Sequence, residues 1–191
     1  RTDRSQTLET RSLIVQDQID LTPRLKAVLG ARYDHHDQQL ENHVSRTRQT
    51  QQFEEVTPRV GVLFQLTERV GVFANASKSF KPNGGLNAAG AAFSPERGTG
   101  YESGVKFESV DGNFGATFAL FSIDKENVLT SDPADSSFQI AAGQVRSRGF
   151  DAQLTGQVTP ALRLIGGYAY VDAEVREDNT LRPGARLLNI P

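Results

Sequence analysis

Three histidines, His35, His36 and His43, lie in one segment that also carries several carboxylates. Neutral imidazole and carboxylate groups are common ligands of transition metals, so this cluster is the first candidate for a metal site. Adjacent residues of an extended chain point in opposite directions, however, so His35 and His36 cannot both face one ion. The surrounding residues 34–54 are rich in Gln, Asn and Arg, which predicts a solvated loop and no dedicated metal site.

Other catalytic and nucleotide-binding arrangements are not supported by the residue pattern. No serine lies in a nucleophile elbow, and none lies beside a His–Asp pair of the kind that activates a catalytic serine. Neither Gly84-Gly85 nor Gly166-Gly167 opens a helical pattern, so neither pair predicts a phosphate-binding loop. The chain has no cysteine and a formal net charge of −2, which gives no basic signal for nucleic acid. We therefore expect a protein that is not an enzyme, holds no cofactor and binds no nucleic acid.

Arg146 and Arg148 stand at alternate positions in line with an apolar stripe that includes Phe150 and Leu154. If that stripe faces lipid, a cation at the bilayer midplane costs about 2–4 kcal/mol, falling to about 0–1 kcal/mol near the interface. This gradient places both arginines above the apolar band, where they would contact the phosphates of lipopolysaccharide. A bulge that shifted the alternation would turn them inward instead.

Short turns that share a pattern divide the chain at residues 21–25, 66–70 and 158–162, with a further turn at 111–113. Their spacing of about 45 residues is typical of a repeated unit, here a long hairpin, because each turn is flanked by two-residue alternation. The connections between hairpins are longer and polar. These lie at 34–54, 81–98, 131–143 and 175–185, and the strands are expected at 10–21, 24–33, 55–66, 69–80, 99–109, 114–129, 144–158 and 161–174.

Short turns at one end, long connections at the other and strands of about ten residues indicate an all-β, antiparallel transmembrane β-barrel. The mean hydropathy of −0.43 is too polar for membrane-spanning helices but suits strands that keep one face in a wet lumen. A soluble all-β domain, with its apolar face against a second sheet, stays open. In the barrel, the expected convex, lipid-facing residues are Leu29, Val62, Val72, Phe118, Leu154 and Leu164, and the concave ones are Arg59, Glu102, Lys106, Asp151 and Gln153.

Residues 101–106, Tyr-Glu-Ser-Gly-Val-Lys, belong to a series of motifs that occur in a characteristic order. The series closely resembles the TonB-dependent siderophore receptors, and most of all their ferrichrome and hydroxamate branch. The resemblance runs from about residue 10 to the end of the chain. Its other motifs lie at 79–82, 93–98, 121–133, 143–150 and 189–191.

This resemblance implies a receptor of the bacterial outer membrane, with a barrel of about 22 strands and a lumen filled by a plug domain. Such a receptor carries ferric siderophore inward with energy relayed by TonB, so iron enters only as a chelate. Residues 1–191 would then form a partial barrel of about eight to nine up-and-down strands, with the plug, the TonB box and the C-terminal strands outside it. An outer-membrane hydrolase and a soluble adhesin-like sheet are the alternative functions.

A ferric hydroxamate complex is bulky and weakly charged, so aromatic surfaces with a few donors would suit it. Residues at or near the ends of the long connections are the candidates, because those ends should face the cell exterior. They are Tyr33, Phe80, Lys81 and Phe93.

Overall fold

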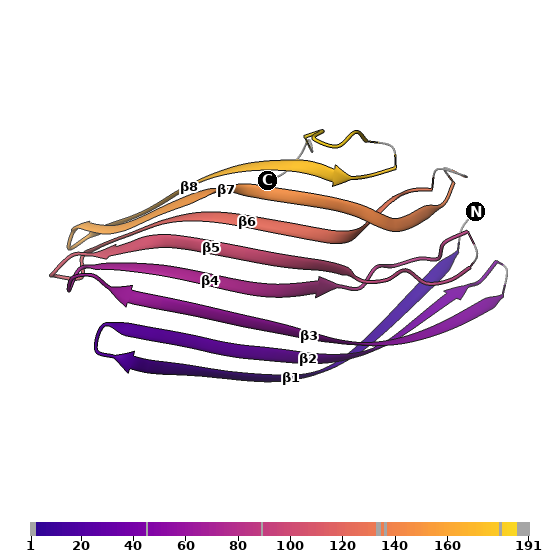
Figure 1. Ribbon diagram of the computed structural model, residues 1–191, viewed down its shortest axis with the longest axis horizontal. Coiled ribbons are helices and arrows are strands. Elements are labelled where there is room, and N and C mark those ends of the chain that lie inside the picture. The colour runs from indigo at the N-terminus through magenta and orange to yellow at the C-terminus, as the bar shows by residue number, and fades with distance from the viewer. Residues whose placement is uncertain are drawn as a thin grey trace.

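The computed structural model describes residues 3–44, 46–88, 90–132, 135, 137–179 and 181–186, which form one eight-stranded antiparallel sheet. Every strand pairs with its neighbours in sequence, in the order β1 to β8 (Figure 1). This confirms the all-β, up-and-down fold. No helix in the described part of the chain is long and apolar enough to cross a membrane. The strands are β1 (Arg4–Thr22), β2 (Leu25–Asn42), β3 (Thr47–Gln65), β4 (Val70–Lys81), β5 (Glu96–Glu108), β6 (Phe114–Ser131), β7 (Gln139–Thr159) and β8 (Leu162–Glu177).

Each repeated turn begins at a threonine whose hydroxyl closes the turn. Thr22 Oγ1 accepts hydrogen bonds from the backbone N–H groups of Arg24 at 3.2 Å and Leu25 at 3.0 Å. Thr67 Oγ1 does the same for Arg69 and Val70, at 3.2 and 3.1 Å. A hydroxyl that bonds the backbone two or three residues on favours a turn over a continued strand. The repeated sequence motif therefore corresponds to a repeated turn in which a threonine hydroxyl bonds the backbone.

The long polar connection predicted at 34–54 is mostly strand, which corrects the sequence interpretation. β2 and β3 stay paired without a register shift from Leu25↔Phe64 to Asn42↔Thr47. The strands therefore continue beyond their apolar segments, as the long ends of β1 to β3 show in Figure 1. Polar residues occupy both faces there, so no apolar alternation marks the strand. Similarly, β7 begins at Gln139, inside the predicted connection at 131–143.

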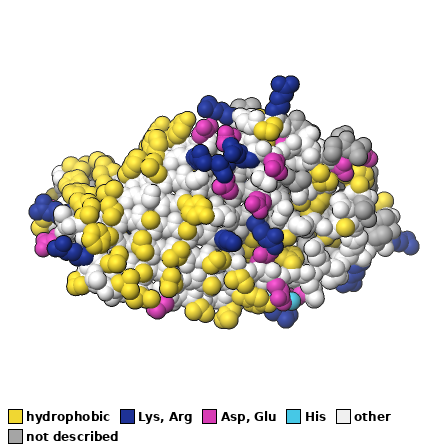
Figure 2. All heavy atoms as spheres, in the orientation of Figure 1, with side chains coloured by type: hydrophobic (Ala, Val, Ile, Leu, Met, Phe, Trp, Pro, Cys, Tyr) yellow, Lys and Arg dark blue, Asp and Glu magenta, His cyan; other side chains and the backbone are white. Residues whose placement is uncertain are grey.

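The two faces of the sheet differ in chemistry. Most of the predicted lipid-facing set is exposed, namely Leu29, Val62, Phe118, Leu154 and Leu164, whereas Val72 is half-buried. Hydrophobic side chains gather over the half of the sheet nearest the short turns, with most charged side chains beyond them (Figure 2). Exposed apolar rows on a single sheet suit lipid, because a soluble sandwich would cover them with a second sheet.

The opposite face is polar but contains one aromatic contact. The ammonium nitrogen of Lys106 lies 5.1 Å from the ring centroid of Phe73, and Asn75 Nδ2 donates to Glu102 Oε2 at 3.1 Å. A Cβ on Gly104 would lie 2.8 Å from two ring carbons of Phe73. Gly104 therefore leaves the room that this ring occupies.

Candidate cargo-binding region

Beyond the apolar band, three polar side chains on one face of β2 are buried. Asp34, His36 and Gln38 are 0%, 3% and 1% exposed, and they alternate with residues on the other face. The sequence predicted a solvated loop here, and that prediction is wrong. At Gln38 this face meets the segment between β4 and β5, residues 82–95, hereafter the β4–β5 connection. Gln38 Nε2 donates to the backbone oxygen of Asn83 in that connection at 3.2 Å.

Asp34 is a buried carboxylate with charged and neutral donors. Arg32 Nε donates to both carboxylate oxygens at 2.8 Å, and Ser12 Oγ also donates to Oδ1. Burial by itself would raise the pKa of Asp34, but the bonds from Arg32 and Ser12 outweigh it and hold the pKa below its ordinary value. Asp34 is therefore ionised at neutral pH and fixes Arg32 against β1.

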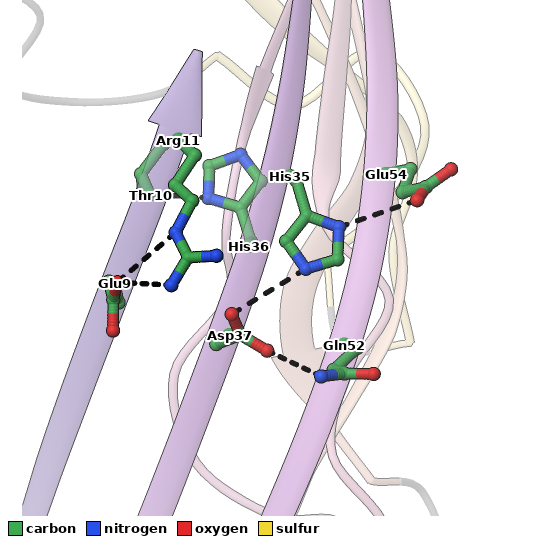
Figure 3. A network of polar contacts seen from close by, with 8 residues as sticks. All are labelled: Glu9, Thr10, Arg11, His35, His36, Asp37, Gln52 and Glu54. Atoms are coloured by element: carbon green, nitrogen blue, oxygen red, sulfur yellow. Dashed lines mark hydrogen bonds and ion pairs between the residues drawn. The ribbon is translucent and has the colours of Figure 1, made fainter.

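His36 lies between two aromatic rings. Its ring stacks on Phe53 with centroids 4.7 Å apart and meets the ring of Phe80 edge-on at 4.9 Å. Its Nδ1 is 2.8 Å from Thr10 Oγ1, a contact drawn in Figure 3. Nε2 is buried with no hydrogen-bond partner in the described part of the chain. Burial lowers the pKa of His36, because a protonated ring would lose its hydration, so the ring is neutral at neutral pH.

The other two histidines have separate partners. His35 points away from His36 and lies between Glu54, 3.3 Å from Nδ1, and Asp37, 3.5 Å from Nε2 (Figure 3). His43 Nε2 is 3.0 Å from Ser5 Oγ. The described residues contain no group of three or more His, Cys, Asp or Glu side chains arranged to hold a metal ion.

The structure brings only some of the predicted cargo residues together. Phe80 is half-buried against His36, and Lys81 is exposed at the end of β4. Phe93 is 6% exposed and lies inside the β4–β5 connection, with its Cε2 3.5 Å from the position of a Cβ on Gly85. Tyr33 is exposed on the face of β2 opposite His36. A direct contact of these residues with cargo stays a prediction.

The sequence interpretation missed Asn83, whose surroundings it read only as a connection. Asn83 is 7% exposed, and its Nδ2 donates to the backbone oxygens of Ser94 at 2.8 Å and Asn127 at 2.9 Å. Asn127 in turn donates to the backbone oxygen of Pro95 at 3.0 Å. The pairing of β6 with β7 shifts at this point, and Asn127 has a φ of 58°. The only local signal was Asn-Gly after a proline, which predicts a turn.

Arg146 and Arg148 keep the alternation of Phe150, since β7 has no register shift between Val145 and Gln157. Arg146 forms an ion pair with Asp124 of β6, whereas Arg148 is exposed. The ring of Phe150 is 5.8 Å from the ring of Tyr170, next along the same face. The two arginines thus stand beyond an aromatic cluster on the same face of β7. Their contact with lipopolysaccharide stays a prediction.

A single antiparallel sheet, apolar on one face and polar on the other, with strands longer than a bilayer requires, defines the wall of an outer-membrane β-barrel. All of residues 1–191 match the family model for the TonB dependent receptor-like β-barrel. The chain belongs to this family, whose members are receptors of the bacterial outer membrane and not enzymes.

Named relatives agree with this assignment. The metal-pseudopaline receptor CntO of Pseudomonas aeruginosa is 50% identical over 198 residues, covering 100% of this chain and 28% of the relative. The ferrichrome outer membrane transporter/phage receptor of Escherichia coli is 32% identical, covering 88% and 22%. The crystal structure of the siderophore receptor PiuA from Acinetobacter baumannii superposes with a TM-score of 0.81 at 25% identity, covering 97% and 28%. The chain therefore spans less than a third of the length of these relatives.

Proposed function

We propose that the chain forms part of the wall of an outer-membrane receptor that imports a metal bound to a small organic chelator, driven through TonB. The observation that carries this proposal is the match of the whole chain to the TonB-dependent receptor barrel. The two-faced sheet supports it, because an apolar outer face and a polar inner face are what a wall between lipid and a wet lumen requires. In this proposal a plug domain and a TonB box complete the receptor.

Two classes of cargo have support. A ferric siderophore is favoured by relatives named as ferrichrome, ferric-pyoverdine and ferrioxamine B receptors. A metal–pseudopaline complex is favoured by the relative that is 50% identical. In both cases the metal is cargo held by its chelator.

Phe80 and Lys81 are the cargo contacts that the structure supports best. Phe80 packs against His36, and Lys81, the next residue of β4, is exposed and points to the opposite face of the strand. An aromatic surface suits a bulky chelate with few charges, and Lys81 supplies a cation at the same strand end. Phe93 shapes the β4–β5 connection from inside, and Tyr33 lies on the face of β2 opposite His36. Arg148, with Arg146 beside Asp124, contacts the phosphates of lipopolysaccharide above the lipid.

The proposal is tested by measuring uptake in cells that lack their own copy of this receptor and carry the full-length receptor instead. The two probes are radiolabelled ferrichrome and radiolabelled metal–pseudopaline, each with and without functional TonB. We expect TonB-dependent accumulation of one probe and saturation of its uptake. Accumulation of neither probe, with the receptor present in the outer membrane, contradicts the proposed cargo classes. Accumulation that does not need TonB contradicts the proposed energy source.

A further inference from the structure

The β4–β5 connection is a folded segment with hydrogen bonds of its own. Within it, the backbone N–H of Asn87 donates to Ala91 O at 2.9 Å, and Asn87 Oδ1 accepts from the N–H of Ala91 at 2.9 Å. Gly90 N–H donates to Asn87 O at 2.9 Å and closes a turn. Phe93 fills the inside of the segment. The connection therefore has a small core and local hydrogen bonds of its own.

Asn83 joins this connection to two distant strands. Both N–H bonds of its amide are used, one for Ser94 within the connection and one for Asn127 in β6. Its own backbone oxygen accepts from Gln38 in β2. β2 and β6 are not neighbours in the sheet, so Asn83 ties together parts of the wall that no strand pairing connects.

Opening the connection would break the bonds that Asn83 makes with Gln38 and Asn127. Asn83 is almost fully buried, and a buried amide that loses its partners must find water or pay the cost of staying unsatisfied. The same movement would uncover Gln38, which is 1% exposed and bonds to the connection. A lid that opens freely is built differently, with few buried contacts and solvated backbone groups.

We propose that Asn83 is a positioning residue, which locks the β4–β5 connection against β2 and β6 and so holds Phe80 and Lys81 in place for cargo. This inference rests on the proposed function, since it assigns Asn83 a role in cargo binding. Among the described residues of the connection, the exposed side chains are small, and Lys81 is exposed just before it at the end of β4. The exposed residues of the connection are Gly84, Ala88, Ala91 and Ser94.

The test compares two isosteric changes in the same connection of the full-length receptor. Asn83→Asp removes both donors and turns a carboxylate toward two carbonyl oxygens. Asn87→Asp adds the same charge but keeps the oxygen that accepts from Ala91, so it is the matched control. Amide hydrogen exchange over residues 82–95 is measured without cargo. Equilibrium binding is measured with ferrichrome and with metal–pseudopaline, and barrel integrity by the heat-dependent shift in gel mobility.

We expect Asn83→Asp to speed exchange over 82–95 and to weaken binding of the recognised probe about tenfold, with Asn87→Asp and the barrel unchanged. Fast exchange in the wild type, or slow exchange in Asn83→Asp, overturns the lock. Faster exchange with unchanged affinity overturns the positioning role. If the wild type binds neither probe, the proposed cargo is wrong, and the exchange result still decides whether Asn83 locks the connection.

Discussion

The ring of His36 meets the ring of Phe80 edge-on with centroids 4.9 Å apart, which joins a buried residue of β2 to a candidate cargo residue of β4. β3 and β4 are paired only from Arg59↔Ser77 to Gln65↔Gly71, so this contact spans the strands beyond the point where their pairing stops. The groups whose charge influences the pKa of His36 are Asp34 and Arg32 on its own strand and Glu55 on β3, with His35 on the opposite face. The protonation state of His36 therefore bears on how Phe80 is held.

Acid should loosen the packing of Phe80, and of the β4–β5 connection that follows it, against His36. The pKa of His36 is lowered in the folded receptor, so the open form binds more protons between the two pKa values and the closed form gains stability as pH rises. As pH falls below about 6.5, protection of the amides in 82–95 should decrease, by at most about tenfold per pH unit. Hydrogen exchange, corrected for intrinsic rates, measures this. His36→Gln should remove the pH dependence and His35→Gln should keep it. An equal pH dependence in His36→Gln would exclude His36 as the cause.

Gly104→Ala should destabilise the barrel by about 1–3 kcal/mol, the range for overpacking a tightly filled site. The new methyl group would lie 2.8 Å from the ring of Phe73 and closer still to the backbone oxygen of Phe118. The temperature at which the full-length receptor loses its folded gel mobility measures the effect. Gly166→Ala on β8 is the control, because a Cβ there meets nothing within 4 Å. Equal melting of both variants would show that the Phe73 ring moves without cost.

The parts of the fold that could be predicted are those determined by residues close together in the sequence. Alternation in residues such as Val60 and Val62 marks a strand because lipid requires an apolar row on one face. The turn at Thr22 is likewise encoded within four residues. The outer ends of β2 and β3 carry polar residues on both faces, as at Gln38 and Gln39, so alternation could not show that they continue.

The candidate site depends on contacts between residues far apart in the sequence. Asp34 and His36 look solvated in the sequence, but Asp34 is buried beside Ser12 and Arg32, and His36 is buried between Phe53 and Phe80. Asn83 bonds to Asn127, which is 44 residues away and lies at a shift in strand pairing that no local motif marks. Phe80 could be placed near a connection from its position after a strand, but its packing against His36 could not.

Leu154→Arg should impair assembly of the full-length receptor in the outer membrane far more than Gln153→Arg. Leu154 is exposed on the apolar face, where a cation near the bilayer midplane costs about 2–4 kcal/mol, whereas Gln153 and Asp151 alternate with it on β7 and lie on the polar face. The yield of heat-modifiable receptor in outer-membrane fractions measures assembly. Equal yields of the two variants would contradict the assignment of the faces.

Phe80→Ala in the full-length receptor should weaken binding of the recognised chelate about tenfold and leave barrel assembly intact, because Phe80 lies at the outer end of β4, beyond the apolar band. Phe93→Ala should weaken binding as well, but with faster amide exchange over 82–95, since its ring is buried inside the β4–β5 connection. Equilibrium binding of labelled ferrichrome and metal–pseudopaline to outer membranes of matched receptor content measures both. Phe138→Ala changes an exposed aromatic residue in another long connection and should bind as the wild type does. Unchanged affinity in Phe80→Ala would remove this ring from the site and leave recognition to the plug and the remaining connections.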